Sequence, residues 1–216
     1  CAGMHCAAFT AVDRAEDEPD LCHAVNACGT LYIARACKEI GAKMLYVSTD
    51  YVFPGVGVEE YETDDKTGPL SVYGKTKLEG EQAVRELGEK FFNVRIAWVF
   101  GLSGNNFIKT MLHLGQTNST LRVVSDQVGT PTYTPDLARL LVDMVETEKY
   151  GTYHATNEGG YISWYDFACE IFCQAGLSVT IQPVTTAAYG LSTAARPFNR
   201  SEERRVGERC RYRWST

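Results

Sequence analysis

The sequence predicts an α/β fold with a doubly wound parallel sheet, and three observations support that class. Short runs rich in β-branched and aromatic residues alternate with runs of helical periodicity along the chain. The mostly apolar run 43–48 ends in Ser48, Thr49 and Asp50, and open α/β sheets bind their ligands at this end of a strand. The chain contains no internal repeat and no low-complexity linker that would indicate a different architecture.

The elements of the first half of the chain are predicted by their periodicity and their end signals. The segment 5–8 is interpreted as the end of a strand that enters a loop. Residues 20–40 have a long helical pattern, and Gly41 follows it as a usual helix stop. A loop rich in Gly, Pro and acidic residues covers 54–70, and Ser71 is the expected N-cap of the next helix.

The second half continues the alternation as far as residue 184, in the order that a parallel α/β architecture requires. The expected strands cover residues 92–100, 121–124, 153–155 and 179–184. The expected helices cover residues 105–114, 136–146 and 163–175, the last of them capped by Ser163.

Length and composition are those of a globular protein. The chain has 216 residues, of which 44% are apolar and 22% charged. No apolar run approaches the roughly 20 residues of a membrane helix, so we expect no membrane association and a cytoplasmic location. The chain opens without a start methionine or a secretory leader, and we interpret it as the middle of a longer protein.

The eight cysteines form neither a disulfide framework nor a metal-binding pattern. No C-x-x-C pair occurs, and no histidine has a matching spacing. We interpret them as small thiols in a reducing compartment and predict no metal ligands in the chain.

Residues 200–216 are basic, whereas the rest of the chain is acidic. The net charge of −6 argues against a nucleic-acid binder, but residues 200–216 carry six arginines against three glutamates. This segment resembles the translation of a sequencing adapter joined to a broken reading frame. We therefore treat 200–216 as a non-native tail, with a basic arm that binds phosphates as the alternative.

Two residues of the helix after Ser71 can act together in proton transfer. Tyr73 and Lys77 are four apart, so both side chains project from one helix face. An ammonium group near a phenol stabilises the phenolate and lowers the pKa of the tyrosine from about 10. The phenol then becomes a proton donor to an alkoxide that forms from a carbonyl. A surface helix with an unrelated Tyr and Lys is the alternative.

Thr49 adds a hydroxyl at the strand end that can hydrogen-bond the same carbonyl oxygen and orient it. Taken alone, Thr49 is better explained as a turn or cap residue. A strand-end hydroxyl followed by Tyr73 and Lys77 on the next helix is, however, the catalytic layout of short-chain dehydrogenases.

Longer motifs extend this layout over nearly all of residues 5–199, in order. Ser-Thr-Asp-Tyr-Val-Phe precedes Pro-Leu-Ser-Val-Tyr-Gly-Lys-Thr-Lys-Leu-Glu-Gly-Glu, and Val-Arg-Ile-Ala-Trp-Val-Phe-Gly follows. Further matching segments are residues 7–16, 105–112, 126–132 and 153–159. With these motifs the chain resembles the dTDP-4-dehydrorhamnose reductases of the extended short-chain dehydrogenase/reductase family (RmlD type).

The resemblance implies a fold and a reaction. The fold would be Rossmann-like but incomplete, with a small substrate-binding α/β part. The enzyme would reduce the C4 keto group of dTDP-4-dehydro-6-deoxy-L-mannose to give dTDP-L-rhamnose, with hydride from NADPH or NADH. Thr49 would polarise the keto oxygen, Tyr73 would donate the proton, and Lys77 would lower the pKa of Tyr73 while holding the nicotinamide ribose.

The resemblance also implies binding residues. The cofactor would contact the strand-end loop residues Ala7, Ala8 and Phe9, together with Tyr73 and Lys77. The substrate would contact Thr49, Asp50, Trp98 and Arg196, the last through its diphosphate. A core aromatic is the alternative for Trp98. Asn26 is expected mainly to support the structure, and Gln127 with the turn 129–132 either to face the nucleotide sugar or to be plain loop.

The first β-strand, glycine-rich turn and helix of a dinucleotide fold have no counterpart here, because no G-x-x-G-x-x-G occurs. The resemblance implies that roughly fifty residues precede the chain and a few tens follow. Residues 1–100 would belong to the cofactor domain and 101–199 to the sugar-nucleotide portion, interleaved with the last elements of the cofactor domain. We expect the fragment alone to bind cofactor poorly and to be inactive. A homodimer, with Mg²⁺ at an interface absent from the fragment, is a further expectation.

Two alternatives remain at this point. The regulatory subunit of methionine adenosyltransferase is similar in the segments around Thr49 and Tyr73, and it serves as a partner without turnover. Another sugar-nucleotide reductase, epimerase or dehydratase would use the same three residues. Trp98 and the segment 126–132 favour the reductase.

Overall fold

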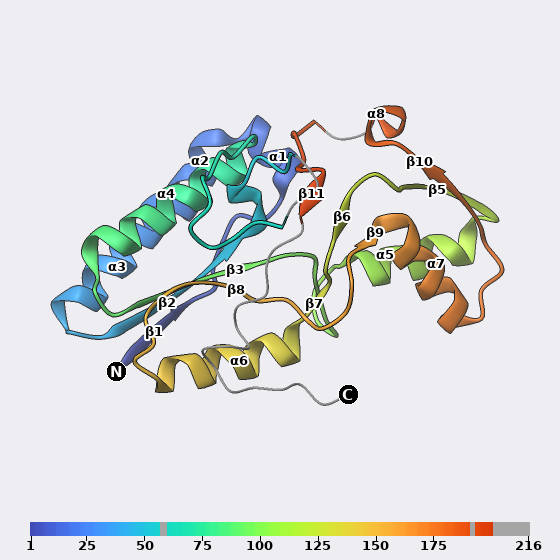
Figure 1. The fold of residues 1–216 in the computed structure, drawn as a ribbon. Coiled ribbons are helices and arrows are strands. Elements are labelled where there is room, and N and C mark those ends of the chain that lie inside the picture. The colour runs from blue at the N-terminus through green and yellow to red at the C-terminus, as the bar shows by residue number, and fades with distance from the viewer. Residues whose placement is uncertain (57–59, 191–192, 201–216) are drawn as a thin grey trace.

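The computed structural model describes residues 1–56, 60–190 and 193–200, and its centre is a parallel four-stranded sheet (Figure 1). The strands are β1 (Ala2–His5), β2 (Lys43–Thr49), β3 (Phe91–Ile96) and β8 (Gly151–His154), in the order β1-β2-β3-β8. In the register, Met4 lies opposite Leu45, and Leu45 lies opposite Phe92. All four strands run in one direction, which confirms the parallel sheet expected from the alternation of elements.

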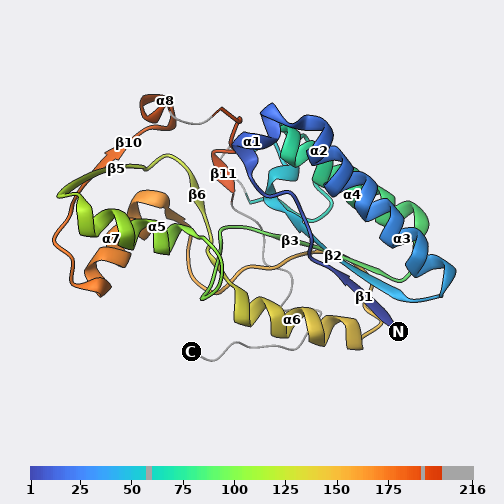
Figure 2. The ribbon, with the colours of Figure 1, turned by 180° about the vertical axis from the view of Figure 1, so that it is seen from behind.

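Helices cover both faces of this sheet. Helices α3 (Gly29–Glu39) and α4 (Val72–Leu87) lie on one face, and α6 (Thr134–Glu146) lies on the other (Figures 1 and 2). The pleat of the strands explains the two layers, because successive side chains point to opposite faces. Leu45 of β2 packs in the core under α6, whereas its neighbour Tyr46 packs in the core under α3 and α4.

The long helix predicted over 20–40 is interrupted by one π-helical turn. After α1 (Val12–Asp17), the chain forms α2 (Pro19–His23), the π turn Ala24–Cys28 and then α3 without a break. A π turn inserts one extra residue into the helix, and such turns are frequent at functional sites. The prediction was correct for the helix and missed this insertion.

A smaller α/β part lies at the far end of the sheet from the N-terminus (Figure 1). It contains α5 (Phe107–Thr117), α7 (Trp164–Ala175) and the parallel pair β5 (Thr120–Val124) and β10 (Thr180–Val184), followed by α8 (Thr186–Tyr189). The core between these elements includes Met111, Ala168 and Phe172. The expected cap Ser163 is confirmed, since its Oγ accepts from the backbone NH of Asp166 at 3.0 Å in a full capping box.

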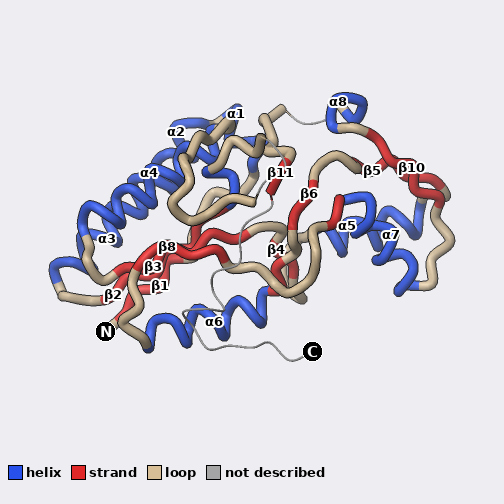
Figure 3. Tube along the Cα trace, in the orientation of Figure 1, coloured by secondary structure: helices blue, strands red, loops and turns tan. Residues whose placement is uncertain are grey.

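Short strands join the smaller part to the main sheet (Figure 3). Strand β4 (Val99–Phe100) pairs with β7 (Thr132–Tyr133), and β6 (Val128–Gly129) lies between β9 (Ile162–Ser163) and β11 (Asn199–Arg200). The prediction of one strand over 92–100 was therefore wrong, because the chain turns between β3 and β4. Trp98 at this turn has a φ of 45°, and no other non-glycine residue of the described part has a positive φ.

The second half of the chain is divided between the two parts. Helix α6 and strand β8 return to the main sheet after the chain has entered the smaller part. Among the described residues, no helix has the length and apolar character that crossing a membrane requires. Of the predicted tail 200–216, the structure describes only the backbone of Arg200, in β11, and the other residues lie outside the described part.

Candidate functional site

The polar strand end of β2 is a short turn organised by Thr49. After β2 the chain forms the 3₁₀ turn Asp50–Val52, and the backbone NH of Tyr51 donates to Thr49 Oγ1 at 3.3 Å. The Thr49 hydroxyl in turn donates to Asp50 Oδ1 at 2.9 Å, and both side chains are buried. The hydroxyl proton expected to face a substrate is therefore directed at Asp50, and it has to rotate before it can donate to a carbonyl.

The first turn of α4 lies directly on this strand end. Ser71 caps the helix as predicted, because its Oγ accepts from the backbone NH of Gly74 at 3.1 Å. A Cβ atom on Gly74 would lie 2.3 Å from the carbonyl oxygen of Tyr51, so only glycine permits this approach. As a result, the buried ring of Tyr73 meets the ring of Tyr51 edge-on, with 5.4 Å between the ring centroids.

Lys77 reaches the same strand one helical turn further along. Its Nζ donates to the carbonyl oxygen of Val47 at 2.8 Å and lies 4.0 Å from the ring centroid of Tyr46. The side chain is only 2% exposed. Burial lowers the pKa of Lys77 to about 7, although the Glu81 carboxylate opposes this shift. The amine can therefore change charge near neutral pH.

Buried polar groups surround Tyr46 beneath Lys77. His5 at the end of β1 stacks on the Tyr46 ring with 5.6 Å between centroids, and its Nε2 lies 3.1 Å from Thr30 Oγ1. Burial, and then the nearby charge of Lys77, lower the pKa of His5. Burial raises the pKa of the Tyr46 phenol, so this hydroxyl stays protonated.

Asn26 of the π turn connects the expected cofactor loop to α4. Its Oδ1 accepts from the backbone NH of Phe9 at 2.8 Å, and its Nδ2 donates to the carbonyl oxygen of Phe9 at 3.2 Å. The same Nδ2 lies 3.2 Å from Thr76 Oγ1 on α4. The expected structural role of Asn26 is confirmed. The adjacent Ala7 is exposed and Ala8 half-buried, so the loop presents accessible backbone at the carboxyl end of β1.

A buried ion pair lies behind these residues, and the sequence analysis did not identify it. Glu81 of α4 and Arg95 of β3 form two parallel hydrogen bonds, with Nε to Oε1 at 2.9 Å and Nη2 to Oε2 at 2.8 Å. Ser48 Oγ also donates to Glu81 Oε1 at 2.6 Å. An arginine inside an apolar strand, with an acid one turn after Lys77, was the available signal.

Trp98 lies in an aromatic cluster on the smaller part. Its ring is buried and stacks on Trp164, with 3.5 Å between centroids and 7° between planes. A Cβ atom on Gly129 would lie 2.9 Å from its Nε1. This indole NH is buried and has no hydrogen-bond partner among the described residues. Trp98 is therefore packed like a core aromatic residue, which was the alternative interpretation, and it also has a buried NH donor that a ligand could satisfy.

A cleft of about 510 Å³ opens beside this cluster. Its lining is apolar with polar groups at several points, and it is formed by Asp13, Phe107, Met111, Arg122, Val123, Val124, Gln127, Trp164, Thr186, Tyr189 and Arg196. Arg196 Nη2 forms an ion pair with Asp13 Oδ2 at 2.5 Å, and its Nη1 donates to the Tyr51 hydroxyl at 3.2 Å. Two residues predicted to face the nucleotide sugar, Gln127 and Arg196, therefore line one cleft, and Arg196 reaches the turn after β2.

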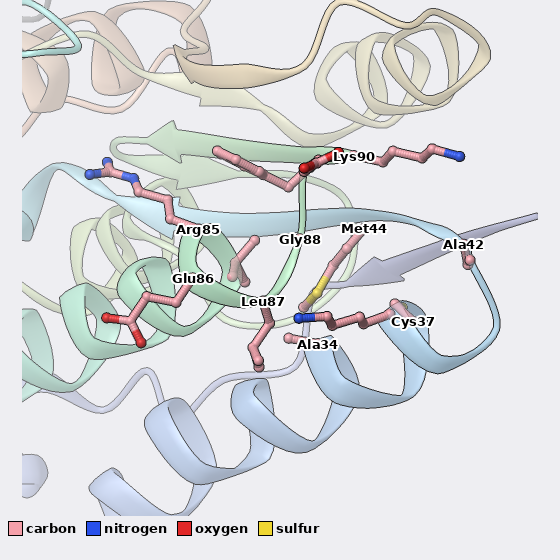
Figure 4. A pocket seen from close by; sticks show the side chains of 14 residues that line it. Ala34, Cys37, Ala42, Met44, Arg85, Glu86, Leu87, Gly88 and Lys90 are labelled. Carbon is pink, nitrogen blue, oxygen red and sulfur yellow. The ribbon is translucent and has the colours of Figure 1, made fainter.

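A second cavity, of about 360 Å³, lies between α3 and α4 near the amino ends of β2 and β3 (Figure 4). Met44, Leu87 and Cys37 line it, with Lys90 at its side. None of the predicted site residues lines this cavity. Ligands of open parallel sheets bind at the carboxyl ends of the strands, so the first cleft is the better substrate site.

Within the described residues, no group of three His, Cys, Asp or Glu side chains is arranged to hold a metal ion. The described cysteines are free thiols, and Cys210 lies outside the described residues.

Comparison with known proteins places these features in a family. The family model of the RmlD substrate binding domain matches residues 3–203. The spore coat polysaccharide biosynthesis protein SpsK of Bacillus subtilis is 41% identical over 95% of this chain and 72% of its own length. A dTDP-4-dehydrorhamnose reductase of Aggregatibacter actinomycetemcomitans is 43% identical over 91% of this chain and 70% of its own length.

The solved structures agree with the sequences. The dTDP-4-dehydrorhamnose reductase of Bacillus anthracis in complex with NADP is 43% identical and superimposes with a TM-score of 0.92. The match covers 96% of this chain and 73% of that one.

Proposed function

The chain belongs to the family of the RmlD substrate binding domain, and from this membership we propose that it is a dTDP-4-dehydrorhamnose reductase. It reduces the C4 keto group of dTDP-4-dehydro-6-deoxy-L-mannose and yields dTDP-L-rhamnose. The observation that carries the proposal is the grouping of Thr49, Tyr73 and Lys77 around the carboxyl end of β2. The names of the relatives favour this activity over a regulatory subunit of methionine adenosyltransferase.

NADPH is the proposed reductant, since the similar reductase of Bacillus anthracis is described in complex with NADP. The bound cofactor supplies the hydride that reaches C4. The accessible backbone of Ala7 and Ala8, held in place through Phe9 and Asn26, fits the nicotinamide end of such a cofactor. Lys77 lies at the same edge of the sheet, where its ammonium can hold a ribose hydroxyl.

Residues of this chain would orient the keto group and protonate its oxygen. Thr49 turns its hydroxyl from Asp50 to the oxygen and orients the carbonyl. As C4 receives the hydride, negative charge develops on this oxygen, and Tyr73 transfers its phenolic proton to it. Lys77, in its ammonium form, stabilises the phenolate that remains until a proton from solvent replaces the one transferred.

The cleft of about 510 Å³ is the proposed site of the nucleotide sugar. Arg196 has the planar fork that suits a diphosphate, and the apolar wall of Met111 and Phe107 suits a base or a deoxysugar. The buried NH of Trp98 would donate to a sugar hydroxyl if the indole shifted toward the cleft. Asp50 would then be released from Thr49 to accept from the substrate.

The test uses the intact protein, NADPH and the 4-keto sugar nucleotide, with absorbance of the reduced cofactor as the readout. We expect cofactor consumption, and in Tyr73→Phe we expect kcat to fall by about two to four orders of magnitude, because the ring remains and the donor hydroxyl is lost. Tyr32→Phe is the matched control, since Tyr32 on α3 is 63% exposed. A wild-type rate in Tyr73→Phe contradicts the proton-donor assignment. Absence of consumption together with tight binding to a synthetase subunit contradicts the reductase.

A further inference from the structure

The buried pair of Glu81 and Arg95 has no part in the mechanism above. Glu81 is completely buried and Arg95 is 1% exposed. Removing two charges from water is costly, and a pair of apolar side chains could fill the same space without that cost. Stability alone is therefore a weak reason for an ion pair at this position. A role in fixing a specific geometry is the better-supported use of such a pair.

The contacts of the pair show which geometry it fixes. Through Ser48, the Glu81 carboxylate is attached to the residue immediately before Thr49. Through Arg95 it is attached to β3 and, by a 3.1 Å bond from Nη1 to the carbonyl oxygen of Thr63, to the loop between the strand end and α4. The Arg95 guanidinium also lies 4.8 Å from the ring centroid of Phe53 in that loop. The pair thus joins the helix, the strand end and the connection between them.

Charge gives Glu81 a second influence on the site. Burial raises the pKa of Glu81, but the hydrogen bonds and charge of Arg95, the bond from Ser48 and the charge of Arg85, whose Nη2 lies 3.2 Å from Oε2, outweigh it and leave the pKa below its usual value. The carboxylate is therefore negative at neutral pH. It lies one helical turn from Lys77, whose pKa it raises. The other titratable groups around Lys77 are His5, Cys6, Cys22, Tyr46 and Tyr73.

We propose that Glu81 is a positioning residue for the reduction. Clamped between Arg95 and Ser48, its carboxylate holds α4 at a fixed place on the strand end that carries Thr49, and it supplies the negative charge that the Lys77 ammonium faces. This inference rests on the proposed function and extends it by a residue that contacts neither substrate nor cofactor.

The experiment measures steady-state kinetics of the intact protein against pH for Glu81→Gln. We expect kcat to fall about 10²-fold, because a small displacement of reacting groups has an effect of this size. The KM for the nucleotide sugar should stay unchanged, since Glu81 does not line the cleft. The alkaline limb of the kcat profile should move to lower pH, because the Lys77 ammonium loses its counter-charge. Glu86→Gln is the matched control on the same helix, where Glu86 is exposed.

Two conservative variants separate positioning from folding. Glu81→Asp keeps the charge with a shorter reach, so its alkaline limb should return to the wild-type pH while kcat remains reduced. Ser48→Ala removes one hydrogen bond and leaves the ion pair intact, so kcat should fall with no shift of the alkaline limb.

The outcomes are distinct. Folded Glu81→Gln with the wild-type kcat and pH profile overturns the proposal, and so does a reduced kcat with an unshifted alkaline limb. If Glu81→Gln does not fold, a wild-type kcat in Ser48→Ala overturns it. An inactive wild type contradicts the proposed function instead. The role of Glu81 is then tested by titrating Lys77 through NMR of ¹³C-labelled lysine. A Lys77 pKa that is the same in Glu81→Gln and wild type overturns the proposal.

Discussion

Among single residues, Lys77 combines a proposed catalytic role with an environment that is unfavourable for a charged amine. Its amine is almost completely buried, and its pKa of about 7 lies far below the usual value of a lysine. Among the described residues, the ammonium is compensated directly by one hydrogen bond, to the carbonyl oxygen of Val47, and by the face of the Tyr46 ring. A group placed at such a cost, at the ligand-binding end of a parallel sheet, is typical of an active site.

The pKa of Lys77 predicts how stability depends on pH. In the folded protein the amine releases its proton near pH 7, whereas in the unfolded chain it does so near 10.5. The unfolded state therefore binds more protons between these values, and the free energy of unfolding increases with pH through this window. The destabilisation due to Lys77 is complete below about pH 7 and disappears toward 10.5.

The measurement is urea unfolding of wild type and Lys77→Met from pH 7 to 9. Methionine does not titrate. The free energy of unfolding of wild type, relative to that of the variant, should therefore increase by about 1.4 kcal/mol for each pH unit. Lys75→Met on the same helix is the control, because Lys75 is exposed and the difference should stay constant. A constant difference for Lys77→Met would show that the buried amine does not titrate near neutral pH.

At the scale of elements, the turn between β3 and β4 holds the aromatic cluster in place. Trp98 adopts a left-handed backbone conformation that a bulky side chain rarely takes. The close approach of Gly129 in β6 and the stacking on Trp164 of α7 maintain it. Strain that is maintained by several elements at once suggests a selected arrangement, in agreement with the proposed contact between Trp98 and the sugar.

Gly129→Ala tests this arrangement. A methyl group at this position would lie 2.9 Å from the Trp98 ring and must displace the indole. We expect a changed tryptophan fluorescence, a stability loss of about 1–3 kcal/mol from overpacking, and a higher KM for the nucleotide sugar with unchanged NADPH affinity. Gly160→Ala serves for comparison, because a Cβ atom there meets nothing within 4 Å. An unaltered KM in Gly129→Ala would remove Trp98 from the substrate site.

At the scale of the whole molecule, the cleft depends on how the two parts are joined. The segment 193–198 runs from the smaller part back to the strand end of the main sheet. Arg196 contacts Asp13 of α1 and the hydroxyl of Tyr51, and the backbone NH of Phe198 donates to Gly55 at 3.2 Å. A residue close to the end of the described chain therefore lines the cleft and also contacts the turn after β2.

Arg196→Met should weaken binding of the nucleotide sugar in the intact protein. The guanidinium is the proposed diphosphate ligand, and losing a charged hydrogen bond corresponds to about a 10- to 100-fold increase in the dissociation constant. Calorimetric titration with dTDP measures it, and NADPH affinity should be unaffected. Arg139→Met is the parallel control, since Arg139 is exposed on α6, on the other face of the sheet. Equal dTDP affinities in Arg196→Met and wild type would exclude the diphosphate contact.

Local patterns in the sequence predicted most of the helices and strands and singled out three candidate catalytic residues. Apolar periodicity, helix caps such as Ser71 and Ser163, and the polar end of β2 are local signals, and each depends on residues a few positions apart. Tyr73 and Lys77 were identifiable because one helical turn separates them. For the same reason, the sequence could not locate the break after β3, where long-range packing against Gly129 and Trp164 overrides the continuous apolar run.

The surroundings of those residues come from contacts between segments that are distant in the sequence. The pairing of Glu81 with Arg95, the support of Phe9 by Asn26, and the cleft at Arg196 join segments far apart in the chain. Each depends on the packing of α4, the π turn and the segment 193–198 against the sheet. The periodicity of the sequence does not predict such long-range contacts. The burial that lowers the pKa of Lys77 likewise exists only when helix and strand have closed over the amine, because desolvation is a property of the folded interior.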